Sequence, residues 1–286
     1  RHPMYAAHIW WAVGQILLIP NWIAGFSLIA FVIIHYLSRV KEEEQMMRKK
    51  PSLVKEVVSQ LNKVKIDPSA KAVVLLVNSP GGSVTASDIL YHEIKKLKIA
   101  RDIPIIVCMM NVAASGGYYV SLPADHIFAH KTTITGSVGV VFIRPKFQGL
   151  MEKIGVGIET SQSGKNKDMG SPFRPTTPAE EQAFQEIIDE MAALFKSRVL
   201  EHRKLGASVT EEVMTAKIYT ASQALKAGLI DEIGFTDDAI IKAKEMAGLD
   251  STARVVMYRR AIFADDNIYN NLTAKTGTGS PMMDLG

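Results

Sequence analysis

The sequence predicts an α/β protein with a parallel sheet and flanking helices, preceded by an N-terminal membrane helix or helical hairpin. Two continuous apolar runs rich in β-branched residues, 72–77 and 103–109, alternate with segments of helical periodicity, which is the pattern of βαβ units. Each run is followed by a turn rich in glycine and small residues. Two longer apolar runs, 4–19 and 22–37, precede this region and predict the membrane segment.

The N-terminal apolar runs are separated by Pro20-Asn21. Each has about 16 residues, slightly fewer than the ~20 that a helix needs to cross a bilayer. A single span over 22–37, with Trp22 and Tyr36 as interfacial anchors, and a tight hairpin with both ends on one side both remain open. A buried hydrophobic hairpin in a soluble protein is a third interpretation.

The charge of the chain is concentrated beside these runs. The formal net charge is +4 over 286 residues, and residues 1–50 carry six Lys and Arg against three Glu. A basic excess next to an apolar segment indicates a membrane-surface flank, and we expect no nucleic-acid partner. With 47% hydrophobic and 22% charged residues the chain is neither collagen-like nor wholly disordered, and its single cysteine excludes an internal disulfide framework.

The remaining elements follow in order along the chain. Thr177 and Pro178 form a helix-start signal, with a capping side chain and a proline at the first helical position, so we expect a long amphipathic helix from Pro178 to about Lys204. A polar loop at 163–177 precedes it. The other expected helices are 53–64, 85–97, 222–227 and 236–246, and the other expected strands are 126–129, 139–142 and 157–160.

The two small-residue turns are the strongest candidates for chemistry. Gly81-Gly82 follows the first buried strand, and Ser115-Gly116-Gly117 follows the second. Because the carboxyl ends of parallel strands meet at one edge of a sheet, we expect these turns to be neighbours. One offers unobstructed backbone amides, as an oxyanion hole requires, and the other offers a hydroxyl among small residues. Close packing of a helix against a strand would explain the same glycines without chemistry.

A reactive serine needs a base, and the residues alone leave several choices open. His126 and His130 lack an evident orienting carboxylate, whereas Lys165 and Lys167 lie in the polar loop and need a lowered pKa to accept a proton. The histidines are scattered without metal-ligand spacing, and we interpret Cys108 as a small buried hydrophobe. No glycine motif for phosphate or dinucleotide binding is present.

Five motifs in order resemble the signal peptide peptidase A family, membrane serine peptidases built on the Clp protease/crotonase fold. The resemblance runs from about Leu53 to Ala247. The motifs are Leu75-Leu76-Val77-Asn78-Ser79-Pro80-Gly81-Gly82, Ala113-Ala114-Ser115-Gly116-Gly117-Tyr118-Tyr119, Thr135-Gly136-Ser137-Val138-Gly139-Val140, Ser163-Gly164-Lys165-Asn166-Lys167-Asp168 and Ala224-Leu225-Lys226-Ala227-Gly228-Leu229-Ile230-Asp231-Glu232-Ile233-Gly234.

This resemblance implies a Ser-Lys peptidase. Ser115 matches the nucleophile and Lys167 the general base, with Lys165 as the competing lysine. The backbone amide of Gly82 matches the oxyanion-hole position, and Ser137 matches a serine that orients the lysine. The implied reaction is acyl transfer through an acyl-enzyme, and it requires neither a metal nor an organic cofactor.

The resemblance also implies partners and a location. Family members form ring or dome oligomers in which adjacent subunits can share an active site, and they cleave hydrophobic segments such as released signal peptides. We therefore expect a homo-oligomer in contact with membrane lipid, in the cell inner membrane. The positive-inside rule places the basic flank in the cytoplasm, whereas one-span family members imply an outward-facing domain, so the side stays open.

The chain departs from the family in two ways. A valine-rich strand that usually precedes the helix at 53–64 is missing, and residues 1–47 resemble the C-terminal half of the isoprenylcysteine carboxyl methyltransferase family. We thus expect a membrane-anchoring, methyltransferase-like segment with a basic linker at 1–50, a peptidase domain at 51–250 and a tail at 251–286.

Four alternative hypotheses for the function remain open. The first is a catalytically impaired scaffold of the same fold, and the second is methyltransferase activity with S-adenosylmethionine from the N-terminal segment. A crotonase-type acyl-CoA enzyme is the third. The fourth is a Clp-type Ser-His-Asp peptidase, but this needs a histidine where Val140 stands.

Overall fold

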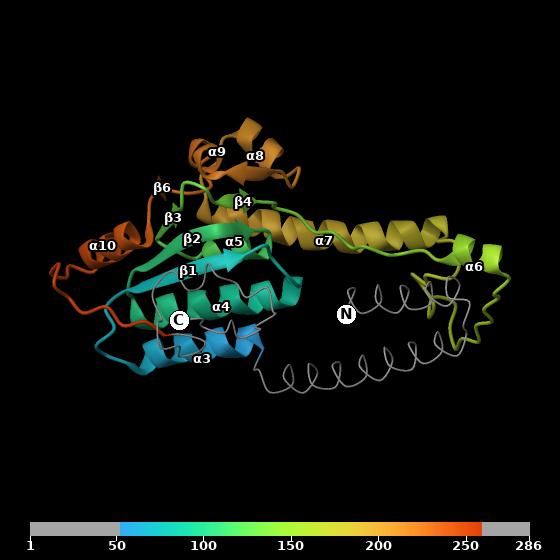
Figure 1. Ribbon diagram of the computed structural model, residues 1–286, viewed down its shortest axis with the longest axis horizontal. Helices are drawn as coiled ribbons and strands as arrows, with labels where there is room; N and C mark the ends of the chain where they lie inside the picture. The colour runs from blue at the N-terminus through green and yellow to red at the C-terminus, as the bar shows by residue number, and fades with distance from the viewer. Residues whose placement is uncertain (1–51, 259–286) are drawn as a thin grey trace, which may run out of the picture. The chain divides into compact units, whose positions relative to one another are not determined.

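The computed structural model describes residues 52–258 of the chain (Figure 1). A compact unit begins at Val57 and includes the described residues that follow it. The expected membrane segment, basic linker and most of the C-terminal tail lie outside the described residues. Within residues 52–258, no helix has both the length and the hydropathy that crossing a bilayer requires.

A six-stranded, mostly parallel sheet organises this unit, as the sequence predicts. The long central strand β2 pairs in parallel with β1, β3 and β4, β6 pairs in parallel with β3, and only the β4–β5 pair is antiparallel. The strands are β1 (Val73–Ser79), β2 (Ile105–Ala114), β3 (His126–Ala129), β4 (Ile134–Gly136), β5 (Ile218–Thr220) and β6 (Glu232–Ile233).

Helices cover both faces of this sheet. Alternate residues of β2 point to opposite sides: Ile106 and Cys108 pack against α10, whereas Val107 and Met109 pack toward α5 and the C-terminal part of α7. Both faces of β2 are therefore buried, which explains its continuous apolar sequence. The helices are α3 (Leu53–Ile66), α4 (Val84–Arg101), α5 (Gly116–Ser121), α6 (Gln148–Ile154), α7 (Pro178–His202), α8 (Ala207–Val213), α9 (Ala221–Lys226) and α10 (Thr236–Met246).

Two expected strands are wrong. Residues 139–142 and 157–160 have no strand partner and run as irregular chain. Val141 is 78% exposed, so the apolar run that predicted a strand lies on the surface of this chain. The strand that pairs with β2 is instead the short β4, which lies just before the first of these runs.

Helix α7 joins two environments. Near its C-terminus, Phe195 and Val199 belong to the main core. Near its N-terminus, Phe184 packs against Phe142 and the loop at Gly170, while α6 lies at the same end (Figure 1). We call residues 141–190, which comprise this loop region and the N-terminal half of α7, the arm.

Candidate active site

Ser115 occupies a strained turn at the carboxyl end of the central strand. It connects β2 to α5 with φ +52° and ψ −120°, a conformation that side-chain-bearing residues rarely adopt. Its amide donates to Gly136 O at 2.8 Å, and its carbonyl accepts from Tyr119 N at 2.9 Å. A sharp strand-to-helix turn of this kind presents a serine hydroxyl at the edge of a sheet. The half-buried Ser115 is held in that position by its backbone bonds.

The two glycine turns are neighbours, as the sequence predicts. A Cβ on Gly81, which has φ +108°, would lie 2.9 Å from Ser115 Cβ. A Cβ on Gly117 would lie 2.5 Å from Ser79 O, at the end of β1. These contacts leave no room for larger residues, so glycine is required for the turns to approach each other.

Backbone amides are available beside this serine. A Cβ on Gly116 would lie 3.3 Å from Gly82 N, so the amides of these two glycines lie close together. Gly116 is the first residue of α5, where helix geometry leaves the amide without an intrahelical acceptor. Gly116 is therefore a second candidate donor for an oxyanion, which was not expected from the sequence. Its place directly after a serine that ends a strand is the signal that indicates it.

Ser137 follows the neighbouring strand at the same level. Ala114 pairs with Gly136 in the parallel β2–β4 register, so Ser115 and Ser137 come next on the two strands. Ser137 also has a positive φ, +54°, and its amide donates to Lys217 O at 2.8 Å. The ammonium of Lys217 forms an ion pair with Glu212, and this hydrogen bond raises the lysine pKa. Lys217 is thereby held in its charged form and is unsuited to act as a base.

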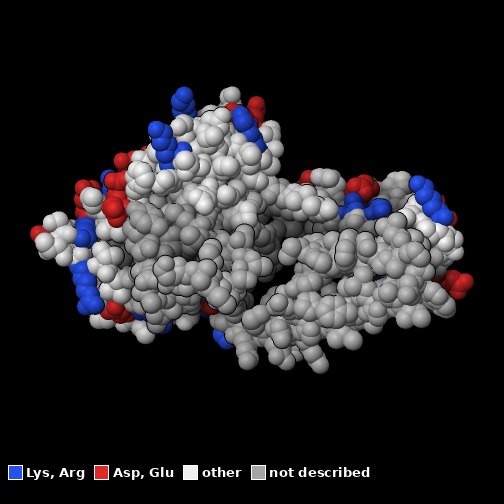
Figure 2. Space-filling model, in the orientation of Figure 1, with Lys and Arg blue, Asp and Glu red and all other residues white. Residues whose placement is uncertain are grey.

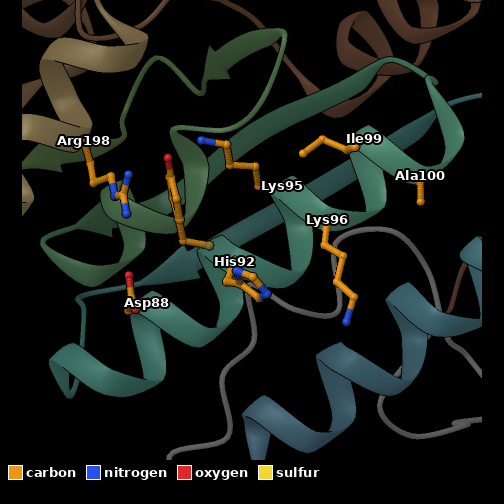
Figure 3. A pocket seen from close by; sticks show the side chains of 8 residues that line it. Asp88, His92, Lys95, Lys96, Ile99, Ala100 and Arg198 are labelled. Carbon is orange, nitrogen blue, oxygen red and sulfur yellow. The ribbon is translucent and has the colours of Figure 1, made fainter.

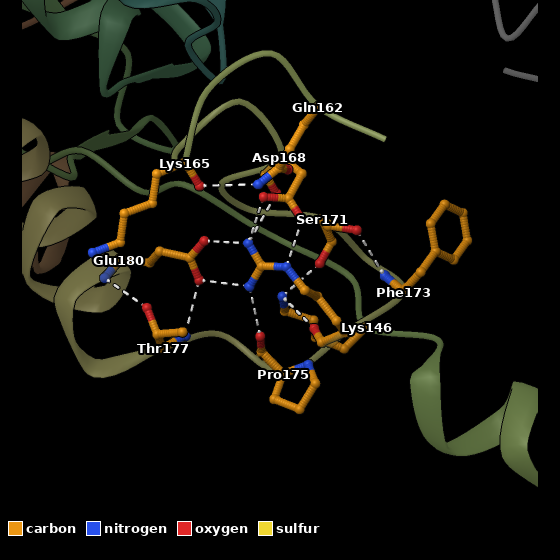
Figure 4. A network of polar contacts seen from close by, with 10 residues as sticks. Lys146, Gln162, Lys165, Asp168, Ser171, Phe173, Pro175, Thr177 and Glu180 are labelled. Atoms are coloured by element: carbon orange, nitrogen blue, oxygen red, sulfur yellow. Dashed lines mark hydrogen bonds and ion pairs between the residues drawn. The ribbon is translucent and has the colours of Figure 1, made fainter. Parts of the chain in front are cut away.

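A network of polar contacts organises the loop that contains Lys167, and Figure 4 shows Asp168, Thr177 and Glu180 within it. The Arg174 guanidinium donates to both carboxylate oxygens of Asp168, at 2.7 and 2.9 Å, and to Glu180 Oε2 at 2.9 Å. Thr177 and Glu180 form the capping box that begins α7, as the predicted start signal required. These bonds lower the pKa of Asp168 and bring that of Glu180 to about 2. The loop is therefore tied to the N-terminus of α7.

Lys167 and Ser115 are not brought together within one chain. Lys167 is exposed and directly precedes Asp168, at the N-terminal end of α7. Ser115 is four residues from Tyr119, whose ring packs on Phe195 with centroids 5.0 Å apart. Because the helix rises 1.5 Å per residue, Glu180 and Phe195 are about 22 Å apart along its axis. The competing Lys165 is exposed in the same loop and shares this separation.

The two histidines considered as bases lie at another level of the sheet. In the β2–β3 register, His126 pairs with Ile106 and Ala129 pairs with Met109. His130 thus lies near Met110, and five further residues of extended strand separate this level from Ser115, about 16 Å. Neither histidine is in reach of the serine hydroxyl.

Metal and thiol chemistry have no support among the described residues. Within 52–258, no group of three or more His, Cys, Asp or Glu side chains is arranged to hold a metal ion. Cys108 is fully buried between Met110 and Thr236, and burial raises the pKa of its thiol. It is a core residue, as the sequence predicts.

A pocket of about 540 Å³ lies along α4. It begins at Asp88, and in Figure 3 Lys95 and Arg198 point toward each other across it. Both cations are bound to Glu201, at 2.6 and 3.0 Å. On the face in Figure 2, acidic side chains lie among the basic ones over the described residues. The charges of this pocket are thus largely paired within the protein.

A serine on a strained strand-to-helix turn, facing glycine amides at the carboxyl edge of a parallel sheet, defines the class of serine hydrolases. The sequence matches peptidase family S49 over residues 98–250 and the Clp protease family over residues 34–133. The chain belongs to peptidase family S49, as the resemblance implied. A shorter match to the isoprenylcysteine carboxyl methyltransferase family covers residues 1–49, outside the described part.

Individual relatives agree with this assignment. The chain is 41% identical over 201 residues to a predicted protease of Methanocaldococcus jannaschii, and 38% identical over 202 residues to a predicted signal peptide peptidase A of Enterococcus faecium. These alignments cover 70% and 71% of this chain but only 64% and 58% of the two relatives. A serine protease of Arabidopsis thaliana chloroplasts is 34% identical over 72% of this chain and 30% of its own length.

A solved structure of a ClpP1 variant from Listeria monocytogenes superposes with a TM-score of 0.44 and 17% identity, over 66% of this chain and 87% of that chain.

Proposed function

We propose that the chain is a membrane-anchored serine endopeptidase that hydrolyses hydrophobic, signal-peptide-like segments with a Ser-Lys dyad shared between subunits. Ser115 is the nucleophile and Lys167 of an adjacent copy the general base. Gly82, assisted by Gly116, donates backbone amides to the oxyanion, and Ser137 orients the lysine. The single observation that carries this proposal is the strained Ser115 turn packed against the Gly81-Gly82 turn.

The chemistry follows from these positions. Lys167 removes the hydroxyl proton as Ser115 Oγ attacks the peptide carbonyl, and the resulting oxyanion accepts hydrogen bonds from the two glycine amides. The lysine then gives the proton to the leaving amine, and water hydrolyses the acyl-enzyme by the same route. A lysine accepts the proton only when it is neutral, and burial within an assembled site favours the neutral form.

The separation of serine and lysine supports a site made by two copies. About 22 Å of α7 lie between the levels of the two residues, far more than a lysine side chain can bridge. The arm also exposes large apolar side chains, among them Val141 at 78%, Ile143 at 80% and Ile154 at 64%. Exposed apolar surface of this kind is typical of a face that another protein covers. A second copy that buried the arm would carry its Lys167 to a neighbouring Ser115.

The remaining parts of the proposal concern mainly residues outside the described range 52–258. Residues 1–50 anchor the protein in the cell inner membrane, in contact with lipid, and 251–286 form a tail beyond the peptidase domain at 51–250. An anchored site meets substrates that leave the bilayer, which favours hydrophobic peptides bound in extended form. The orientation of the domain across the membrane depends on whether residues 4–37 form a hairpin or residues 22–37 form a single span.

The test is complementation between two inactive variants. Detergent-solubilised Ser115→Ala and Lys167→Ala proteins should each fail to cleave a fluorogenic hydrophobic peptide, while the matched variant Lys165→Ala remains active. If each site takes its serine and its lysine from different copies, random co-assembly of the two variants restores about one quarter of the wild-type sites. No recovery, with both variants assembled, would show that the dyad is not shared. Full activity of Ser115→Ala would refute the peptidase site itself.

One observation favours a second function. The distance between Ser115 and Lys167 within one chain is also expected of a catalytically impaired scaffold of the same fold. A wild-type protein that assembles, yet neither cleaves peptides nor reacts with a fluorophosphonate at Ser115, would establish that alternative.

A further inference from the structure

Tyr119 joins the serine turn to the helix that follows the glycine turn. Its backbone amide donates to Ser115 O at 2.9 Å, and its side-chain hydroxyl donates to Asp88 Oδ1 at 2.8 Å. Asp88 belongs to α4, whose capping residue Ser83 directly follows Gly82. Tyr119 is therefore bonded through its backbone to Ser115 and through its side chain to α4. The amide of Gly82, the candidate oxyanion donor, lies directly before the capping residue of that helix.

The tyrosine ring has little freedom to move. It is 5% exposed and lies edge-on to Tyr91 of α4, with centroids 5.2 Å apart, and to Phe195 of α7, at 5.0 Å. Burial first, and the hydrogen bond to Asp88 second, raise the pKa of Tyr119 to about 12, against the opposing influence of Arg198. The hydroxyl therefore keeps its proton at neutral pH and acts as a fixed donor.

Further polar contacts of α4 with the segment after α5 are remote from the serine. Lys98 Nζ donates to Pro123 O at 3.0 Å, beyond the C-terminal end of α5. Asp88 and Lys98 are ten residues apart on α4, which corresponds to about 15 Å along the helix axis. The Tyr119–Asp88 bond thus connects α5 to the N-terminal part of α4, close to the end of the glycine turn.

We propose that Tyr119, with Asp88 as its acceptor, is a positioning residue that sets the geometry between Ser115 and the amide of Gly82. This role rests on the proposed peptidase function. Oxyanion donors are effective only at 2.7–3.1 Å from the developing charge, so a small rotation of α5 against α4 weakens transition-state binding without removing any catalytic group. Ground-state binding of the peptide is unaffected, because Tyr119 lies beneath the turn and is almost fully buried.

The experiment compares two tyrosines of the same aromatic cluster in the full chain. Tyr119→Phe removes only the hydroxyl that reaches Asp88, and Tyr91→Phe removes the hydroxyl that contacts His202 Nε2 at 2.8 Å. We expect Tyr119→Phe to lower kcat by about 10- to 100-fold with KM within about twofold, since slight misplacement of reacting groups has effects of this size. Tyr91→Phe should leave both constants within about twofold of the wild type.

Substitutions of the acceptor complete the design. Asp88→Asn keeps an oxygen that can accept from Tyr119 and should retain most of kcat, whereas Asp88→Leu should match Tyr119→Phe. Tyr119→Phe combined with Asp88→Leu should be no worse than Tyr119→Phe alone, because the tyrosine substitution already removes the bond to Asp88, together with the hydroxyl's contact with Arg198. Thermal melting of every variant, and the rate at which a fluorophosphonate labels Ser115, separate a positional effect from a loss of folded protein.

The outcomes distinguish this inference from the function on which it rests. If Ser115→Ala is inactive but Tyr119→Phe retains full kcat and labelling rate, the positioning role is wrong and the peptidase stands. If both tyrosine variants lose kcat in proportion to their melting temperatures, the hydroxyl is merely structural and the role is again wrong. If wild-type Ser115 takes up no label and Ser115→Ala cleaves as well as the wild type, the proposed function fails and the positioning role fails with it.

Discussion

Substitution of Gly81 by alanine tests the contact between the two turns directly. The φ of Gly81 is +108°, a region essentially reserved for glycine, and a non-glycine residue there costs about 1–3 kcal/mol. The new Cβ would stand 2.9 Å from Ser115 Cβ and 3.0 Å from Gly116 N, an overpacking that costs about 1–3 kcal/mol more. We therefore expect the free energy of unfolding to fall by about 2–6 kcal/mol.

The same clash should reach the reaction. The contact is relieved only if the Ser115 turn moves away, and a displacement of about 1 Å lowers reactivity by about 100-fold. Urea unfolding followed by circular dichroism measures the first effect, and the rate of fluorophosphonate labelling at Ser115 measures the second. Gly149→Ala in α6 is the control, because its Cβ meets no atom within 4 Å. Wild-type stability and labelling rate in Gly81→Ala would refute the close approach of the turns.

Three further outcomes are expected. Arg174→Gln should make trypsin cleave within 163–177 faster while the melting of the sheet hardly changes, and unchanged cleavage would contradict the central place of this guanidinium. The pKa values of Glu180 and Asp168 lie below their unfolded values, so these carboxylates stabilise the loop fully above about pH 4.5, and this stabilisation is lost as the pH falls toward about 2. The rate at which pepsin cleaves the loop, normalised to the rate for a free peptide, should therefore rise as the pH falls through that range. Glu180→Gln should abolish most of this rise. Tyr118→Phe removes a fully buried hydrogen bond of 2.9 Å to Leu229 O. This loss should lower the free energy of unfolding by about 1–2 kcal/mol, and each kcal/mol should lower the melting temperature by about 2–4 °C. An unchanged melting curve would argue against that bond.

The strands and helices that the sequence predicts well are those whose pattern depends on burial inside one chain. The runs 72–77 and 103–109 became β1 and β2, and 126–129 and 236–246 match β3 and α10 residue for residue. The run 139–142 has the same apolar character but no neighbouring strand, so it is exposed and irregular. An apolar composition predicts that a segment is buried, but it does not show whether the same chain provides the surface that buries it.

The short elements were missed for a different reason. Helices α6 and α8 have only seven residues each, too few to establish a helical period. Strands β5 and β6 have three and two residues, and they exist because β4 and β3 already provide an edge for them. Tertiary pairing determines such elements, and local sequence does not.

The candidate site likewise has a part that the sequence predicts and a part that it does not. The proximity of Gly81 and Ser115 follows from parallel topology and could be inferred from motif positions alone. Ser137 was assigned by the resemblance alone, because the strand that precedes it, β4, was not expected. The position of Lys167 could not be inferred, because it depends on how far α7 extends and on the ionic bonds that hold its N-terminal loop. The resemblance supplied Lys167 as the proposed base, and in the structure Lys167 and Ser115 lie at different levels of the molecule.

The length of α7 has a consequence for when the protein can act. With the proposed nucleophile and base held at levels of α7 about 22 Å apart, a newly synthesised chain contains both proposed catalytic side chains yet has no complete site. Activity then grows more steeply than the amount of protein, since it requires an encounter between copies. Dilution of the protein therefore lowers its activity, and no inhibitor is needed for this effect. A peptidase built in this way does not cleave neighbouring proteins during its own synthesis, because its site is complete only after two copies have associated.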